Sequence, residues 1–245
     1  MFSLCIATMN RYEKFLKKYL PYYLDIDLVD EIIITDENGK DIECIQKDFQ
    51  NSKLKLFQNT TQLGPFLNKL KAMKLAKNDW IVIIDSDNFA DKEYFVTANN
   101  YILSKNLKNE TILAPSFAKP NFNYTIFSNT ISTKSNMKEL TKYNKPGYSP
   151  FTTLMNTGNY IIHKYLVQNI NIEKENDIIP KTSACDVIYF NTLLIEQFAN
   201  LEIHIVSNLE YTHVVHDDSI YIRTHKQYPS INTKVHERFY KCILN

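Results

Sequence analysis

Glycine is scarce in this chain: only 4 of its 245 residues are glycine, at positions 39, 64, 147 and 158. Glycine adopts positive φ and allows close approach of the backbone without penalty. We therefore expect each of the four at a position that needs one of these properties. The scarcity also excludes some classes of site. The chain contains no P-loop sequence, and residues 7–11, the turn after the first predicted strand, contain no glycine to wrap a phosphate.

Long apolar runs, clustered cysteines and an excess of charge are also missing. No apolar run approaches the roughly 20 residues of a membrane span, and residues 1–9 lack the basic start of a signal peptide. The 4 cysteines are scattered without metal-type spacing, so we expect reduced thiols and a cytoplasmic location. With 28 basic and 27 acidic residues, the net charge gives no reason to expect a nucleic acid as partner.

Strand-like and helix-like segments alternate through the first half of the chain. Apolar patterns predict strands at residues 2–7, 31–35, 54–57, 81–84 and 112–117. Helices are predicted at residues 12–24, 42–49, 65–77 and 92–104, the first bent or ended near its last turn by Pro21 and the last capped by Asp91. This alternation is typical of an α/β fold with a mostly parallel, Rossmann-like central sheet flanked by helices.

The second half of the chain is less regular. Residues 118–150 predict a loop region with a hairpin, and loops of this length are often functional. Residues 160–162 are apolar, residues 186–198 predict a helix, residues 203–206 predict a late strand, and a tail rich in histidine follows. Because the chain contains no internal repeat and no low-complexity linker, we expect a single domain over residues 1–245.

Two carboxylates directly follow the apolar strand at residues 81–84. Asp85 and Asp87 lie at the carboxyl end of a predicted parallel strand, where open α/β sheets bind ligands. Carboxylates this close repel each other unless a cation lies nearby. Mg²⁺ and Mn²⁺ prefer oxygen ligands, and they are often held by one or two carboxylates together with substrate phosphates. The pair therefore predicts a divalent-metal site, with a polar turn over residues 85–88 as the alternative.

Five short motifs follow one another along the chain: Thr8-Met9-Asn10-Arg11, Gly64 followed by Lys69, Asp85-Ser86-Asp87, Asn156-Thr157-Gly158-Asn159 and Cys185-Asp186. Together they resemble glycosyltransferase family 2, whose members have the GT-A fold and use nucleotide-sugar donors. The similarity is good over residues 2–105 and patchy beyond. Lys69 replaces the usual arginine, which keeps a cation but loses bidentate geometry, and Cys185 replaces the usual glutamate.

The resemblance implies a donor site. The residues expected to bind the nucleotide sugar are Thr8, Arg11, Asp36, Gly64, Lys69, Asp85 and Ser86. Those expected near the metal, Mn²⁺ or Mg²⁺, are Asp85, Asp87, His213 and His216, with Asp87 as the first direct ligand and Asp85 holding the ribose or a metal-bound water. Those expected near the transferred sugar and the acceptor are Thr157, Gly158 and Asn159.

Two parts of this donor site have alternatives. Asp36 lies beside Asn38-Gly39 and is also suited to a turn. The alternative for His213 and His216 is a pair of surface histidines on a flexible tail.

Asp186 is the predicted general base. The resemblance places the catalytic aspartate at this helix start, where a carboxylate would take the proton of the acceptor hydroxyl. The alternative is a simple N-cap, a role for which Ser183 competes. The expected function is a metal-dependent transfer with inversion, in which a hexosyl or pentosyl group moves from a nucleotide-diphosphate sugar, with UDP favoured, to a hydroxyl of a glycan or other acceptor.

This function divides the expected domain into two halves, with the nucleotide sugar bound by residues 1–117 and the acceptor by residues 118–245. Two other functions remain open from the sequence. One is a non-catalytic module that binds a nucleotide sugar or a glycan, which would have no need for Asp186. The other is a nucleotidyltransferase of similar fold, against which the turn without glycine at residues 7–11 argues.

Overall fold

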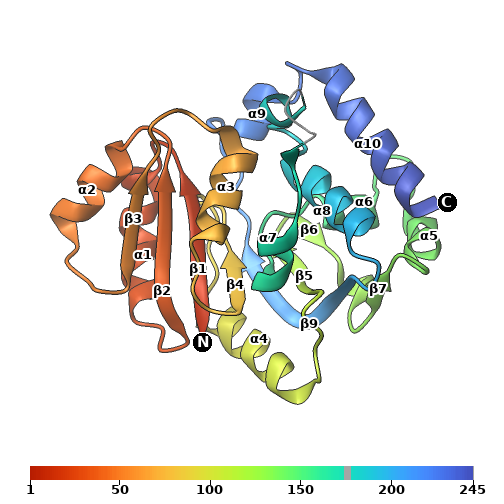
Figure 1. Ribbon diagram of the computed structural model, residues 1–245, viewed down its shortest axis with the longest axis horizontal. Coiled ribbons are helices and arrows are strands. Elements are labelled where there is room, and N and C mark those ends of the chain that lie inside the picture. Colours follow the sequence, from red (N-terminus) through yellow and green to blue (C-terminus); the bar gives the residue numbers. More distant parts are fainter. Residues whose placement is uncertain (174–177, 245) are drawn as a thin grey trace.

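The computed structural model describes residues 1–173 and 178–244. A nine-stranded sheet runs through the molecule in the order β3-β2-β1-β4-β8-β5-β9-β7, with β6 paired to β5 (Figure 1). Its strands are β1 (Phe2–Thr8), β2 (Val29–Asp36), β3 (Leu54–Gln58), β4 (Trp80–Ile83), β5 (Thr111–Lys119), β6 (Phe122–Asn123), β7 (Ile131–Thr133), β8 (Ile161–His163) and β9 (Glu202–Thr212).

Most of these strands point in one direction. The neighbours β3, β2, β1 and β4 pair in parallel. Strand β8 is antiparallel to both β4 and β5, so β5 points the same way as β4, and β9 is parallel to β5. Only the short strands β6, β7 and β8 run in reverse. The predicted α/β fold with a mostly parallel sheet is therefore confirmed.

Helices flank the sheet along its length (Figure 1). A π-helical segment, Tyr12–Leu16, leads into the first α-helix. The α-helices are α1 (Lys17–Leu24), α2 (Lys40–Asp48), α3 (Gly64–Lys74), α4 (Lys92–Ser104), α5 (Met137–Leu140), α6 (Pro150–Met155), α7 (Lys164–Asn169), α8 (Asp186–Gln197), α9 (Ile220–Thr224) and α10 (Pro229–Leu244). Among the described residues, no helix is long and apolar enough to cross a membrane.

The core lies on both faces of the central strands. Leu4 of β1 and Ile81 and Val82 of β4 are fully buried, as expected for parallel strands covered by helices on both sides. Burial of apolar surface stabilises the folded state by roughly 25 cal/mol for each Å² removed from water. The buried strand β4 therefore fixes the position of the carboxylates that follow it.

Local signals placed several boundaries well. Gly39 has φ +81° and precedes α2, as its expected turn role requires. Asp91 caps α4 by accepting a hydrogen bond from the backbone N–H of Tyr94 at 3.1 Å. Pro21 lies in the last turn of α1, which ends at Leu24 as predicted.

The second half contains more structure than the sequence patterns predicted. Within residues 118–150, β5 and β6 form the expected hairpin, and β7 adds an unexpected strand beside β9. Strand β9 covers 11 residues, whereas only residues 203–206 were predicted. The expected tail instead ends in α10, which packs against α8 and α5. These elements build the far side of the cleft described next.

Candidate active site

A cleft of about 680 Å³ opens where the ends of β1 and β4 meet the starts of α3 and α8. This volume lies within the range of small-molecule sites. Of the described residues that the sequence predicted for the site, Asp36 and His216 do not line the cleft. Those that do are Thr8, Arg11, Gly64, Lys69, Asp85, Ser86, Asp87, Thr157, Gly158, Asn159, Asp186 and His213.

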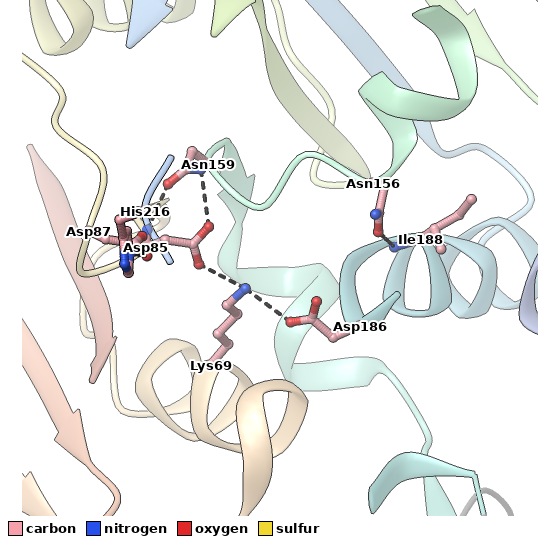
Figure 2. Close-up of polar contacts among 8 residues, drawn as sticks. All are labelled: Lys69, Asp85, Asp87, Asn156, Asn159, Asp186, Ile188 and His216. Atoms are coloured by element: carbon pink, nitrogen blue, oxygen red, sulfur yellow. Dashed lines mark hydrogen bonds and ion pairs between the residues drawn. The ribbon is translucent and has the colours of Figure 1, made fainter. Parts of the chain in front are cut away.

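Lys69 connects the two parts of the cleft that carry carboxylates. Its Nζ lies 2.8 Å from Oδ1 of Asp85 and 3.0 Å from Oδ2 of Asp186. Figure 2 shows the ammonium group between the two carboxylates, one after β4 and one at the start of α8. The lysine is therefore not a solvated surface charge: its side chain is only 19% exposed.

Burial and charge act against each other in this group. Burial lowers the pKa of Lys69, but the neighbouring carboxylates of Asp186 and Asp85 outweigh burial and raise it well above its ordinary value. Burial raises the pKa of Asp186, and the ammonium of Lys69 offsets only part of that rise. At neutral pH the lysine is thus charged, and Asp186 is a stronger proton acceptor than an exposed aspartate.

Asn159 fixes the first carboxylate of the pair from the other side. Its Oδ1 accepts a hydrogen bond from the backbone N–H of Asp85 at 2.7 Å, and its Nδ2 donates to Oδ2 of the same residue at 3.2 Å. The neighbouring Gly158 leaves the necessary space, because a Cβ there would lie 3.0 Å from Oδ2 of Asp85 and 3.2 Å from Nζ of Lys69. The groups that approach this glycine closely are therefore side chains of the protein itself.

Asp87 contacts a histidine from the last part of the chain. Nε2 of His216 lies 2.8 Å from Oδ2 of Asp87 (Figure 2). The imidazole also packs on Phe15, with ring centroids 5.0 Å apart. Its Nδ1 is buried and has no hydrogen-bond partner in the described structure. Residues 129 positions apart thus meet at the end of β4.

His213 is placed differently. Its Nδ1 lies 2.8 Å from Oδ1 of Asn121, and its ring packs edge-on against Phe122. Burial lowers the pKa of this imidazole, so it is neutral at pH 7. Both histidines belong to the ordered site region rather than to a loose surface tail. His216 contacts a carboxylate of the predicted metal site, whereas His213 lines the cleft nearby.

The two carboxylates that follow β4 are paired with side chains of the protein. Each carboxylate already has a protein partner, since Lys69 neutralises Asp85 and His216 contacts Asp87. Among the described residues, no group of three or more His, Cys, Asp or Glu is arranged to hold a metal ion. Asp87 with His216 would supply two protein ligands, which fits an ion that takes its remaining ligands from substrate phosphates and water. Asp85 contacts Lys69 and Asn159.

The turn after β1 is held by a residue that the sequence reading missed. Asp41 in the first turn of α2 accepts hydrogen bonds from Oγ1 of Thr8 at 2.5 Å and from the backbone N–H of Arg11 at 3.0 Å. The guanidinium of Arg11 donates from Nη2 to the backbone carbonyl of Asp218 at 2.6 Å. Thr8 therefore shapes the turn, and Arg11 ties it to the segment before α9. The sequence signal that could have identified Asp41 is an acidic residue in the first turn of a predicted helix.

Asp36 takes the alternative role that its sequence position allowed. The side chain is fully buried, and it accepts hydrogen bonds from the backbone N–H groups of Asn38, Asp41 and Ile42. Burial raises its pKa. The carboxylate thus caps α2, and it is not among the residues that line the cleft. The next residue, Glu37, lines the cleft instead and accepts from the backbone N–H of Leu63 at 2.7 Å.

Asp186 is not the N-cap of α8. Cys185 occupies that position, and no side chain caps the helix there. Asp186 is the first helical residue and directs its carboxylate to Lys69. Asn156, from the predicted acceptor-side motif, accepts a hydrogen bond from the backbone N–H of Ile188 at 3.1 Å and so caps the first turn of the helix from outside it (Figure 2). Thr157 beside it is held by the hydroxyl of Tyr124 at 2.7 Å.

These features define a class of protein: a Rossmann-like α/β protein of the GT-A type, with paired carboxylates at the end of a central strand. The profile of glycosyl transferase family 2 matches residues 3–159. The chain belongs to glycosyl transferase family 2, as the sequence motifs predicted. A comparison with curated proteins found no match.

Solved structures share the fold at low sequence identity. The crystal structure of S. aureus TarS in complex with UDP-GlcNAc has a TM-score of 0.68 and 17% identity, over 98% of this chain and 66% of that one. Another TarS structure covers all of this chain, which spans 65% of the TarS chain's length, at a TM-score of 0.65 and 19% identity. Glucosyl-3-phosphoglycerate synthase from Mycobacterium tuberculosis, solved with Mn²⁺, UDP and phosphoglyceric acid, has a TM-score of 0.57 and 12% identity, over 99% and 78%.

Proposed function

We propose that the protein is a glycosyltransferase that moves a sugar from a nucleotide-diphosphate sugar to a hydroxyl group of an acceptor. The observation that carries this proposal is the bridge through Lys69, because it brings the carboxylate after β4 and the carboxylate at the start of α8 to one cleft. Membership of family 2 supports the same class of reaction. The solved neighbours with UDP or UDP-GlcNAc favour a UDP-sugar as donor.

Asp186 would act as the general base of an inverting transfer. Its carboxylate takes the proton from the acceptor hydroxyl while that oxygen bonds to the anomeric carbon and the bond from that carbon to the diphosphate breaks. Burial raises the pKa of Asp186, which strengthens it as a base. Lys69 orients the carboxylate before the reaction and remains beside it after it has taken the proton.

The donor would lie along the turn after β1, the start of α3 and the end of β4. Asp87 and His216 would hold Mn²⁺ or Mg²⁺ together with the diphosphate oxygens of the donor. Such an ion supplies Lewis-acid stabilisation of the negative charge on the leaving diphosphate. Asp85 and Asn159 would position the donor near Lys69, and Arg11 adds a cation at the same end of the cleft.

The test is a screen of UDP-sugars for hydrolysis and transfer, combined with calorimetry of UDP binding in EDTA and in Mn²⁺. We expect slow release of UDP from at least one UDP-sugar, and weaker UDP binding in EDTA. Absence of turnover with every donor, in a protein that still binds UDP, would favour a binding module. Equal affinity for UDP in EDTA and Mn²⁺ would refute the metal site.

A further inference from the structure

One wall of the cleft is built by elements outside the donor half. It combines α6 with residues 183–184 and α10, and its polar lining residues are Ser149, Thr152, Thr153, Asn156, Ser183 and His236. We propose that this wall is the acceptor subsite and that it binds an uncharged sugar or polyol. The proposal rests on the glycosyl transfer proposed above and adds the chemical class of the acceptor.

Two hydrogen bonds on either side of His236 hold its stretch of α10 in place. One turn before it on α10, Oδ1 of Asn232 accepts from Sγ of Cys185 at 3.3 Å. One turn after it, the hydroxyl of Tyr240 lies 2.6 Å from Oγ1 of Thr152 on α6. Residues spaced by four lie on one helix face. His236 is therefore held between the start of α8, which carries the proposed base, and α6.

The groups on this wall suit hydroxyl partners. Nδ1 of His236 donates to the backbone carbonyl of Asn232 at 2.8 Å, so the other ring nitrogen, Nε2, remains for a hydrogen bond with a ligand. The hydroxyl of Ser183 has no hydrogen-bond partner within the described residues and is partly exposed in the cleft. Thr153 donates to the backbone carbonyl of Ser149 at 2.9 Å and keeps a lone pair free.

The charges in the cleft disfavour an anionic acceptor. Among the described residues that line it, the permanent cations are Arg11 and Lys69. Lys69 is already shared by two carboxylates, and Arg11 lies in the turn after β1, within the donor half. The acceptor wall therefore offers no lysine or arginine to a phosphate or carboxylate, while Asp186 beside it repels one. Burying an anion without a partner is strongly unfavourable.

An aromatic ring at the rim supports the same class of ligand. Tyr221 of α9 lines the cleft and is 57% exposed. Its ring lies flat against His225, with an interplanar angle of 11° and a centroid separation of 5.2 Å. A fixed, exposed aromatic face offers an apolar surface with a polar edge, which matches the apolar faces and hydroxyl edges of a sugar ring.

The experiment compares matched neutral and phosphorylated probes on a turning-over enzyme. A UDP-sugar that the protein hydrolyses is held at saturation, and glucose or glucose 6-phosphate, and ribitol or ribitol 5-phosphate, are added at equal concentrations. Release of the free donor sugar and formation of any glycosylated product are measured separately. A probe in the acceptor subsite lowers free-sugar release, because it displaces water or accepts the sugar itself.

We expect at least one neutral probe to lower free-sugar release, with roughly tenfold or more of its phosphorylated counterpart needed for the same effect. Equal or stronger action by the phosphorylated probes would overturn the proposal, as would no effect of any probe on an active enzyme. If no UDP-sugar is hydrolysed at all, the proposed glycosyl transfer fails instead, so the two failures are distinguishable.

Variants assign the effect to this wall. His236→Ala should raise the concentration of the neutral probe needed for half its effect by roughly tenfold, and His236→Gln, which keeps an acceptor, should raise it less. Lys234→Ala changes an exposed residue of the same helix and should leave this probe concentration unchanged. If His236→Ala does not fold, Ser183→Ala gives the same comparison. An unchanged response in His236→Ala and Ser183→Ala would place the acceptor elsewhere.

Discussion

Replacing Lys69 with methionine would remove the cation that lies between Asp85 and Asp186. The ammonium contacts both carboxylates within 3.0 Å, and the side chains of Lys69 and Asp186 are only 19% and 12% exposed. Removal of one partner from a buried ion pair costs about 3–5 kcal/mol. Asp85 is 28% exposed and partly screened by water, so we expect about 3 kcal/mol at neutral pH, or a fall in melting temperature of about 6–12 °C.

The loss should shrink in acid. Burial already raises the pKa of Asp186 in the folded protein, and removal of Lys69 raises it further. A carboxyl whose folded pKa exceeds its unfolded pKa destabilises the fold as the pH rises from the unfolded value through the folded one. The variant should therefore lose most stability at pH 7 and recover most of the difference near pH 4, where the carboxyl binds a proton.

Urea unfolding of the wild type and Lys69→Met at several pH values measures this difference directly. Lys77→Met is the matched control, because it breaks an exposed lysine–aspartate pair with Asp30 and should cost less than about 1 kcal/mol. Lys69→Arg keeps the charge and should lose less than Lys69→Met. A loss in Lys69→Met that is small, or that does not depend on pH, would refute the proposed electrostatic coupling.

Four further variants probe the rest of the site. Gly158→Ala would bring a methyl group to 3.0 Å from a carboxylate oxygen of Asp85, so stability should fall by about 1–2 kcal/mol and donor affinity with it; normal donor affinity would contradict the close packing. His216→Ala should lower Mn²⁺-dependent turnover by roughly 10–100-fold, whereas His213→Ala should lower it less; the reverse order in steady-state assays would exchange their roles. Asp36→Ala should cost about 2–3 kcal/mol in urea unfolding through the lost cap of α2, with a small change in UDP affinity; loss of UDP binding at unchanged stability would restore the nucleotide contact.

Local patterns were enough to predict the first half of the fold. The apolar run at residues 81–84, the turn at Gly39 and the cap at Asp91 each depend on neighbours in the sequence. Strand β9 was predicted too short, because Asn208 adopts φ +61° and interrupts the strand pattern. Helix α10 carried a readable signal, since Val235, Phe239 and Ile243 are buried at a spacing of four, but its many polar residues masked it.

The connections across the cleft could not be predicted from spacing alone. Lys69 meets Asp186 across 117 residues, and Asp87 meets His216 across 129. Such contacts depend on the order of strands in the sheet and on side-chain direction, which no local pattern encodes. Most of the site residues that the family resemblance implied do line the cleft. The resemblance did not indicate that Lys69 joins two of them, that Asp36 does not line the cleft, or that α10 supplies His236.

Asp186→Asn tests whether Asp186 is the base of an inverting transfer. Asparagine keeps an oxygen that can accept from Lys69, and Lys69 keeps Asp85 as its charged partner, so stability and donor binding should change little. Transfer measured at saturating donor and acceptor should fall by about 10²–10⁴, and NMR of the wild-type product should show an inverted anomeric centre. Transfer by Asp186→Asn at the wild-type rate, or retention of configuration in the product, would contradict this account.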